Sequence, residues 1–155
     1  MPLRRTLPLA TDCSGFATLC YFLAGAPDPN GLDYCGQGYT GSLLRHLPHV
    51  GRADVQAGDI VVWGSYPGRH CAVVLEPGED PLLASHGSER GPVELRFSEE
   101  QQWQAPPVNW LDGLPPPRPD VTAPWPSSRA GGDRDDSGAE CPAPELPAGA
   151  DPFEP

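Results

Sequence analysis

The uneven distribution of proline limits how much of this 155-residue chain can form a compact domain. Of 22 prolines, 9 fall in residues 1–104 and 13 in residues 105–155. Proline fixes φ and removes a backbone donor, which disfavours helix interiors and central strands. Residues 105–155 also lack hydrophobic periodicity, so they cannot offset the entropy cost of ordering. We predict a globular domain at residues 1–104 and a disordered, proline-rich acidic tail at residues 105–155. The first residues of this tail are expected to dock on the domain through Trp103, Val108 and Trp110.

The charge of the chain excludes several partners. The formal net charge is -11, and no basic patch is present that could bind phosphate backbones, so we expect no nucleic-acid partner. No apolar run reaches 18 residues, so we expect no membrane insertion. The first residues, MPLRRTLPLATDC, lack the apolar core of a signal peptide, which predicts synthesis in the cytoplasm. We expect a monomer.

A helix is predicted at residues 11–24, with a cysteine in its first turn. Apolar side chains recur there at helical spacing: Phe16, Leu19, Cys20 and Leu23. Thr11 or Asp12 can cap the helix. Cys13 then lies where unpaired N–H groups and the helix dipole favour an anion, which promotes a nucleophilic thiolate. The alternative is a capped core helix whose cysteine only packs.

Residues 58–97 have the composition and alternation of β-strands. Strands are predicted at GDIVVWG (58–64), in the two arms of a hairpin (70–75 and 82–86) and at VELRF (93–97). Centring the hairpin turn on Gly78 places His70 directly across from His86, with their Cβ atoms about 5 Å apart. Cys71 then points to the opposite face, into a core.

The loop between the first helix and the sheet is rich in turn residues, and two short elements complete the expected domain. A helical turn is predicted at residues 42–47, and a polar turn or short helix at residues 98–104. The five cysteines contain no C-x-x-C pair, and His46 and His49 have no neighbouring ligands. We therefore expect neither a metal site nor a cofactor.

A helix-borne cysteine and two facing histidines together suggest nucleophilic catalysis. Cys13 would be the nucleophile, one histidine the base, and the other the group that orients the base. Each histidine alone also has a simpler interpretation: His70 as an edge residue facing water, and His86 as a loop residue before Gly87. Their joint fit with the cysteine favours the catalytic hypothesis.

Four segments in this order resemble the NlpC family (NlpC/P-sixty) of papain-like cysteine peptidases of bacterial cell walls. They are DCSGF, ADVQAGDIVVWG, RHCAVVLE and SHGSERGP, and the loop AGAPDPNGLDYCGQGYTG also resembles phage and actinobacterial members. The resemblance covers about residues 9–97. It implies an α+β papain-like fold, with the nucleophile helix packed on a small antiparallel sheet.

The resemblance also implies an activity and its residues. Cys13 would be the nucleophile, His70 the general base and His86 its orienting group, with Asp12 and Ser14 shaping the cleft and the Cys13 amide binding the oxyanion. The usual substrate is a peptide bond of peptidoglycan stem peptides, next to D-glutamate or diaminopimelate. The expected protein is a cell-wall endopeptidase, such as a phage lysin or a tail-associated enzyme that reaches the wall without a signal peptide.

Two features depart from the family pattern. Members have a longer segment before the cysteine, with a helix and a tyrosine near the site, whereas twelve residues precede Cys13 here and none is tyrosine. Either the chain is a truncated form or another group fills that place. Cys71 stands where a small residue or valine is usual. The alternatives to a peptidase are an amidase or acyltransferase of the same fold, and an inactive interaction module.

Overall fold

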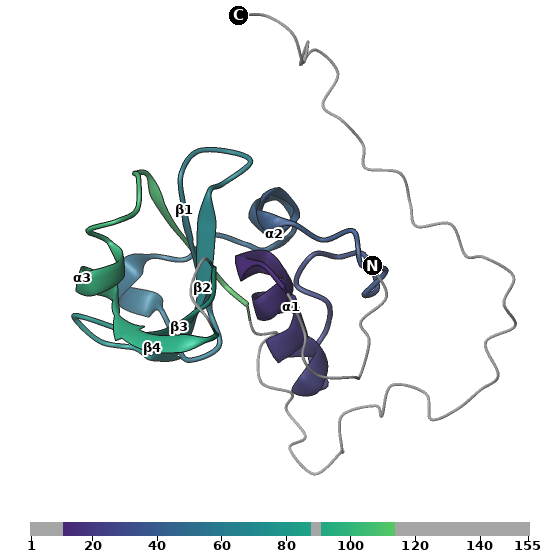
Figure 1. Cartoon of the computed structure of the whole chain (residues 1–155), viewed down its shortest axis with the longest axis horizontal. Helices are drawn as coiled ribbons and strands as arrows, with labels where there is room; N and C mark the ends of the chain where they lie inside the picture. The colour runs from purple at the N-terminus through teal and green to yellow at the C-terminus, as the bar shows by residue number, and fades with distance from the viewer. Residues whose placement is uncertain (1–10, 88–90, 114–155) are drawn as a thin grey trace, which may run out of the picture.

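The computed structural model describes residues 11–87 and 91–113. These residues form an α+β fold around a five-stranded antiparallel sheet with the strand order β4-β3-β2-β1-β5 (Figure 1). In chain order the elements are α1 (Cys13–Leu23), α2 (Thr40–His46), the 3-10 helix η1 (Arg52–Asp54), β1 (Ile60–Trp63), β2 (His70–Glu76), β3 (Leu82–Ser85), β4 (Val93–Arg96), α3 (Phe97–Glu100) and β5 (Val108–Leu111). The predicted α+β class and antiparallel sheet are confirmed.

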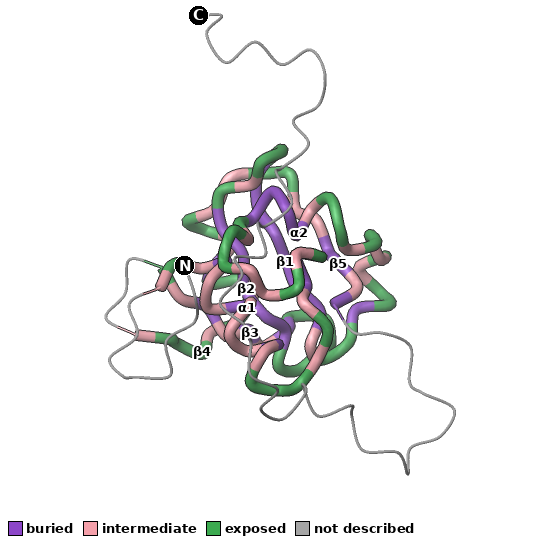
Figure 2. Tube along the Cα trace, turned by 90° about the vertical axis from the view of Figure 1, so that its right-hand side faces the viewer, coloured by how far each residue is buried: buried purple, intermediate pink, exposed green. Residues whose placement is uncertain are grey.

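Each face of the sheet is covered by different helices. The α1 and α2 helices lie on one side, and α3 lies on the other (Figure 1). Because side chains alternate along a strand, neighbouring residues of β1 and β2 enter different clusters. The α1 side holds Ala17, Tyr21, Leu43, Ile60, Val62, Cys71, Val73 and Leu111, and the α3 side holds Val55, Val61, Trp63, Ala72, Val74, Leu83 and Trp110. Burial is accordingly concentrated in the central strands (Figure 2).

The α1 helix packs on the sheet through a different face from the predicted one. Ser14, Ala17 and Tyr21 are its buried residues, whereas Leu23 of the predicted stripe is 75% exposed. Two small side chains let the helix approach β2 closely, and the Tyr21 hydroxyl donates to the Gly58 carbonyl. The face of α1 that packs on the sheet is therefore set by close packing of small side chains and by this polar contact, and not by the predicted apolar stripe.

The β2–β3 hairpin is confirmed, but its register differs by one residue from the prediction. Ala72 pairs with Ser85, which by extension places Gly87 across from His70. The pairing shifts again between Val74 and Glu76. The turn is therefore not centred symmetrically on Gly78, which changes the face to which each β3 side chain points.

The folded domain extends beyond the predicted boundary at residue 104. The β5 strand pairs with β1 along its whole length, and both Trp110 and Leu111 are buried. The prolines at 106 and 107 precede this strand and leave it intact. The docking expected for Val108 and Trp110 is thus a full edge strand. The docking expected for Trp103 is wrong, because its side chain is 84% exposed. The rest of the predicted tail, from residue 114, lies outside the described residues.

Candidate active site

The first turn of α1 holds Cys13 in a fixed place. The helix begins at Cys13 because the Asp12 carboxylate caps it, accepting from the Gly15 amide at 2.7 Å and from the Ser14 hydroxyl at 3.0 Å. A side chain at Gly15 would collide with Thr11 and crowd Asp12, which explains the glycine of DCSGF. The amides of this turn have no acceptor within the helix, and the dipole adds positive potential.

The Cys13 thiol is surrounded by groups that favour its thiolate. It is half-buried, and the side chains of Cys71 and His70 lie close enough to influence its pKa. Hydrogen bonding from Cys71 and His70, with the charge of His70, outweighs burial and lowers the pKa of Cys13 to about 4. The sulfur is therefore ionised at neutral pH, the state required of a nucleophile. The structure brings Cys13 and His70 together, as the sequence predicted.

The His70 ring is held on three sides. It is 8% exposed at the start of β2 and stacks on Trp63 with a centroid distance of 5.6 Å. Its Nε2 atom lies 2.9 Å from the Ser85 hydroxyl and 3.2 Å from a carboxylate oxygen of Glu100. A buried carboxylate at this position stabilises the protonated imidazole and fixes the ring orientation.

The contact of Glu100 with His70 was not predicted from the sequence, although the spacing of residues 97–101 could have indicated that Glu100 is buried. It lies in the stretch predicted as a polar turn or short helix, but only 6% of it is exposed. Gln101 accepts from the Trp63 indole at 2.9 Å, and Phe97 stacks on Trp63 at 5.9 Å, so the α3 segment docks beside His70. Helical spacing is shared by Phe97, Glu100 and Gln101. This spacing places the carboxylate of Glu100 on the packed face of α3, where an acidic residue needs a partner.

His86 does not orient His70 in this structure. Because the register is shifted by one residue, the position facing the Nε2 atom of His70 belongs to Ser85. His86 instead contacts Phe16 of α1, with an edge-on centroid distance of 5.7 Å. Its Nδ1 atom is buried and has no hydrogen-bond partner among the described residues. The prediction that two histidines face each other is therefore wrong.

The predicted cleft residues Asp12 and Ser14 both serve the helix cap. Asp12 is exposed, whereas Ser14 is 3% exposed and its hydroxyl donates to Asp12. Ser14 thus stabilises the turn that presents Cys13.

The remaining histidines lie away from this arrangement. The His46 ring packs beside Gly31, and His49 forms an isolated bridge with Leu111. Within residues 11–87 and 91–113, no group of three or more His, Cys, Asp or Glu side chains is placed to hold a metal ion. None of the helices in that part of the chain is long and apolar enough to cross a bilayer.

Comparisons of the chain with known proteins gave no match to a family model, to a curated protein or to a solved structure. The chemistry of the site therefore has to be argued from its own geometry. A buried imidazole with a carboxylate behind it and a thiolate in front of it can carry out acyl transfer.

Proposed function

We propose that this chain is a papain-like cysteine hydrolase of the NlpC type that cleaves peptidoglycan stem peptides. The observation that carries the proposal is the Cys13–His70 pair at the start of α1, with Glu100 and Ser85 at the far nitrogen of the imidazole. Nucleophile, base and orienting group are the parts that thiol-dependent acyl transfer needs. The order of the motifs DCSGF, GDIVVWG and RHCAVVLE supports the assignment to this family.

The mechanism begins at the Cys13 thiolate. Its sulfur attacks the carbonyl carbon of the scissile amide, and the carbonyl oxygen takes up the electron pair as an oxyanion. First-turn amides of α1 are positioned to stabilise that charge. Protonated His70 then donates its proton to the leaving amine, the C–N bond breaks, and a thioester forms. Water, deprotonated by His70, attacks the thioester and releases the carboxylic acid and the thiolate.

Glu100 is the positioning residue in this mechanism. Nε2 of His70 is engaged by Ser85 and Glu100, so we assign Nδ1 to proton exchange with the sulfur. The Glu100 carboxylate stabilises the imidazolium that alternates with neutral imidazole during turnover. This role replaces the one that the sequence predicted for His86.

The substrate class is inferred from the family resemblance. Members cleave peptide bonds next to D-glutamate or diaminopimelate, which makes a γ-D-glutamyl-diaminopimelate endopeptidase the specific proposal. Delivery during phage lysis, or on a phage tail, would bring the enzyme to the wall. No cofactor takes part in the proposed steps.

Digestion of defined muropeptides tests the proposal. Wild-type chain should cleave the stem peptide, and mass spectrometry should find the new amine and carboxylate termini. Cys13→Ala should abolish turnover, whereas Cys20→Ala, a matched change on the same helix, should retain it. Equal turnover by Cys13→Ala would remove the assignment. Products of amide exchange or of another amide bond would identify an acyltransferase or amidase, and no turnover of any amide would favour an inactive module.

A further inference from the structure

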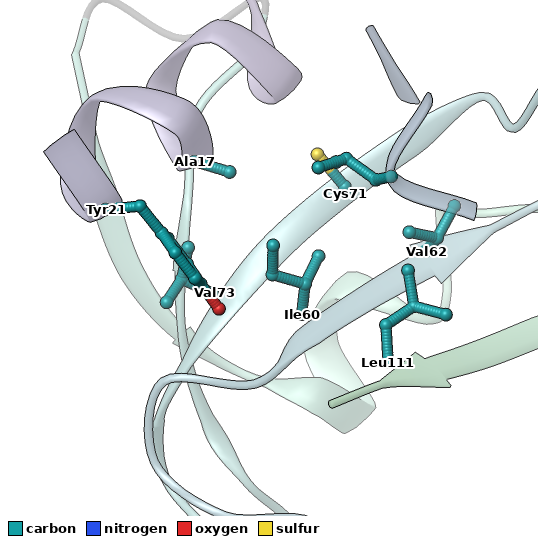
Figure 3. Packing of buried hydrophobic residues seen from close by; sticks show 8 residues of the cluster. Ala17, Tyr21, Ile60, Val62, Cys71, Val73 and Leu111 are labelled. Atoms are coloured by element: carbon teal, nitrogen blue, oxygen red, sulfur yellow. The ribbon is translucent and has the colours of Figure 1, made fainter. Parts of the chain in front are cut away.

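A second cysteine lies directly beside the nucleophile, on the face of the sheet that α1 covers. Cys71 is 1% exposed and belongs to the same cluster as Ala17 and Tyr21 of α1. Its side chain rises from β2 toward that helix (Figure 3). Cys13 packs against this cluster, and the side chain of Cys71 is the largest single influence on the pKa of Cys13. The two cysteine side chains are therefore neighbours in the folded chain.

The two thiols have opposite acid–base properties. Cys71 donates to Cys13, which lowers the pKa of Cys13, and the same contact raises the pKa of Cys71 well above its ordinary value. One member of the pair is thus a thiolate and the other a buried, protonated thiol. A reactive thiolate beside a second thiol is the arrangement from which an oxidised cysteine condenses to a disulfide.

We propose that Cys13 and Cys71 form a site of reversible oxidation, at which a sulfenic acid on Cys13 is captured by Cys71 as an intramolecular disulfide. The oxidant is a hydroperoxide, of which hydrogen peroxide is the simplest. The inference goes beyond the proposed hydrolase activity, because the chemistry needs only the thiol pair and no substrate.

Each step of the oxidation balances. The Cys13 sulfur attacks one peroxide oxygen, the O–O bond breaks, and hydroxide leaves, so that the sulfur loses two electrons and becomes a sulfenic acid. The Cys71 sulfur then attacks the Cys13 sulfur, the S–S bond forms, and the S–O bond breaks. The departing hydroxide combines with the proton of the Cys71 thiol as water. A dithiol reductant restores both thiols by exchange.

The position of Cys71 distinguishes it from the other cysteines as a resolving residue. Cys20 is half-buried two turns further along α1, and burial raises its pKa. Cys35 lies in the loop between α1 and α2. Among the cysteines that the structure describes, Cys71 has the largest effect on the pKa of the Cys13 thiol, and it shares a packed cluster with Cys13. Cys141 lies outside the described residues.

Peptide mapping of the full chain after treatment with hydrogen peroxide tests the proposal without any measurement of activity. Cleavage after Arg69 separates Cys71 from Cys13, Cys20 and Cys35, and fragmentation of a linked peptide distinguishes those three. We expect a Cys13–Cys71 disulfide, formed within one chain and reversed by dithiothreitol. A wild-type chain with sulfinic acid at Cys13 and no cross-link, or with Cys13 linked elsewhere, would overturn the proposal.

Two variants sharpen the result. Cys71→Ser keeps a hydroxyl donor beside Cys13 but cannot form the disulfide, so peroxide should convert Cys13 to sulfinic acid that dithiothreitol does not reverse. Cys20→Ser, which removes a thiol from the same helix, should form the cross-link as wild type does. If the hydrolase is active, its activity should return after reduction in wild type and stay lost in Cys71→Ser. Equal recovery in both would contradict protection by Cys71.

Discussion

At the scale of single residues, two cysteines on one helix show why position decides reactivity. Cys13 and Cys20 are both half-buried on α1, and burial acts against the thiolate of each. At Cys13, donors from Cys71 and His70 outweigh burial. At Cys20, burial is the dominant effect and raises the pKa. The neighbouring donors, rather than exposure, therefore favour the thiolate at Cys13, whereas burial disfavours it at Cys20.

The pH dependence of alkylation tests this difference. Because the pKa of Cys13 is about 4, its thiolate is present above that pH and is lost by protonation as the pH falls through it. We expect the rate of Cys13 labelling by iodoacetamide to stay nearly constant between about pH 6 and 8. Labelling of Cys20 in the same samples should increase with pH. A Cys13 rate that increases about tenfold per pH unit over that range would contradict an ionised sulfur.

Substitutions at Glu100 and His86 decide which residue positions His70. Glu100→Gln removes the charge that stabilises the imidazolium, so we expect kcat to fall about a hundredfold and Cys13 labelling to shift to higher pH. His86→Phe preserves the aromatic contact with Phe16 and removes an unpartnered buried nitrogen, so kcat should persist. The free energy of unfolding of the His86→Phe variant should be about 1 kcal/mol higher than that of wild type.

Glu99→Gln provides the matched control for this pair of variants. Glu99 is exposed and caps α3 by accepting from the Arg96 amide, a contact that glutamine can retain. The kcat of Glu99→Gln and its labelling profile should match those of wild type. Loss of kcat in His86→Phe but not in Glu100→Gln would restore the orienting role that the sequence first suggested for His86.

At the scale of elements, hydrophobic patterns predicted most strands, but polar contacts decided how the elements fit together. The periods of residues 58–64 and 93–97 predicted β1 and β4. Of the two caps predicted for the first helix, the structure shows Asp12, and the helix begins two residues after the predicted start. The hairpin register could not be read from the sequence, because an irregularity between Val74 and Glu76 shifts the pairing. That shift of one residue places Ser85 rather than His86 at the imidazole of His70.

The contribution of α3 docking to the free energy of unfolding can be measured through the contact between Gln101 and Trp63. Gln101 accepts the buried indole N–H of Trp63, and the next residue, Gln102, is exposed. Gln101→Ala leaves that N–H without its partner, so we expect the free energy of unfolding to fall by about 1–3 kcal/mol. The same substitution loosens the docking of α3, and Glu100 belongs to that helix. The kcat of Gln101→Ala should therefore also decrease, because Glu100 is held less firmly beside His70. Gln102→Ala is the control, and urea unfolding of both variants is the measurement; equal stabilities would mean that this contact does not hold α3.

At the scale of the whole molecule, composition located the end of the domain too early. The prolines near residues 106 and 107 resemble the sequence that follows, and a four-residue strand is too short to show a clear period. The β5 strand nevertheless belongs to the domain, because it pairs with β1 at that edge of the sheet and its Trp110 is buried. Long-range pairing of this kind is invisible to local patterns.

Two truncations test where the domain ends. A chain ending at Gln104 lacks β5, and with it the burial of Trp110 and Leu111 and the contact in which the Gly113 amide donates to Asp59. Full burial of each large apolar side chain contributes about 1.5–3 kcal/mol, so the loss is on the order of 5 kcal/mol. Native domains are stable by only about 5–15 kcal/mol, and this chain should therefore fail to unfold cooperatively in urea. A chain ending at Pro116 keeps β5, and it should unfold with the midpoint of the full chain. If the shorter chain unfolded with that same midpoint, the sheet would not need its fifth strand, and the packing that places Trp63 beneath His70 would have to be sustained by four strands alone.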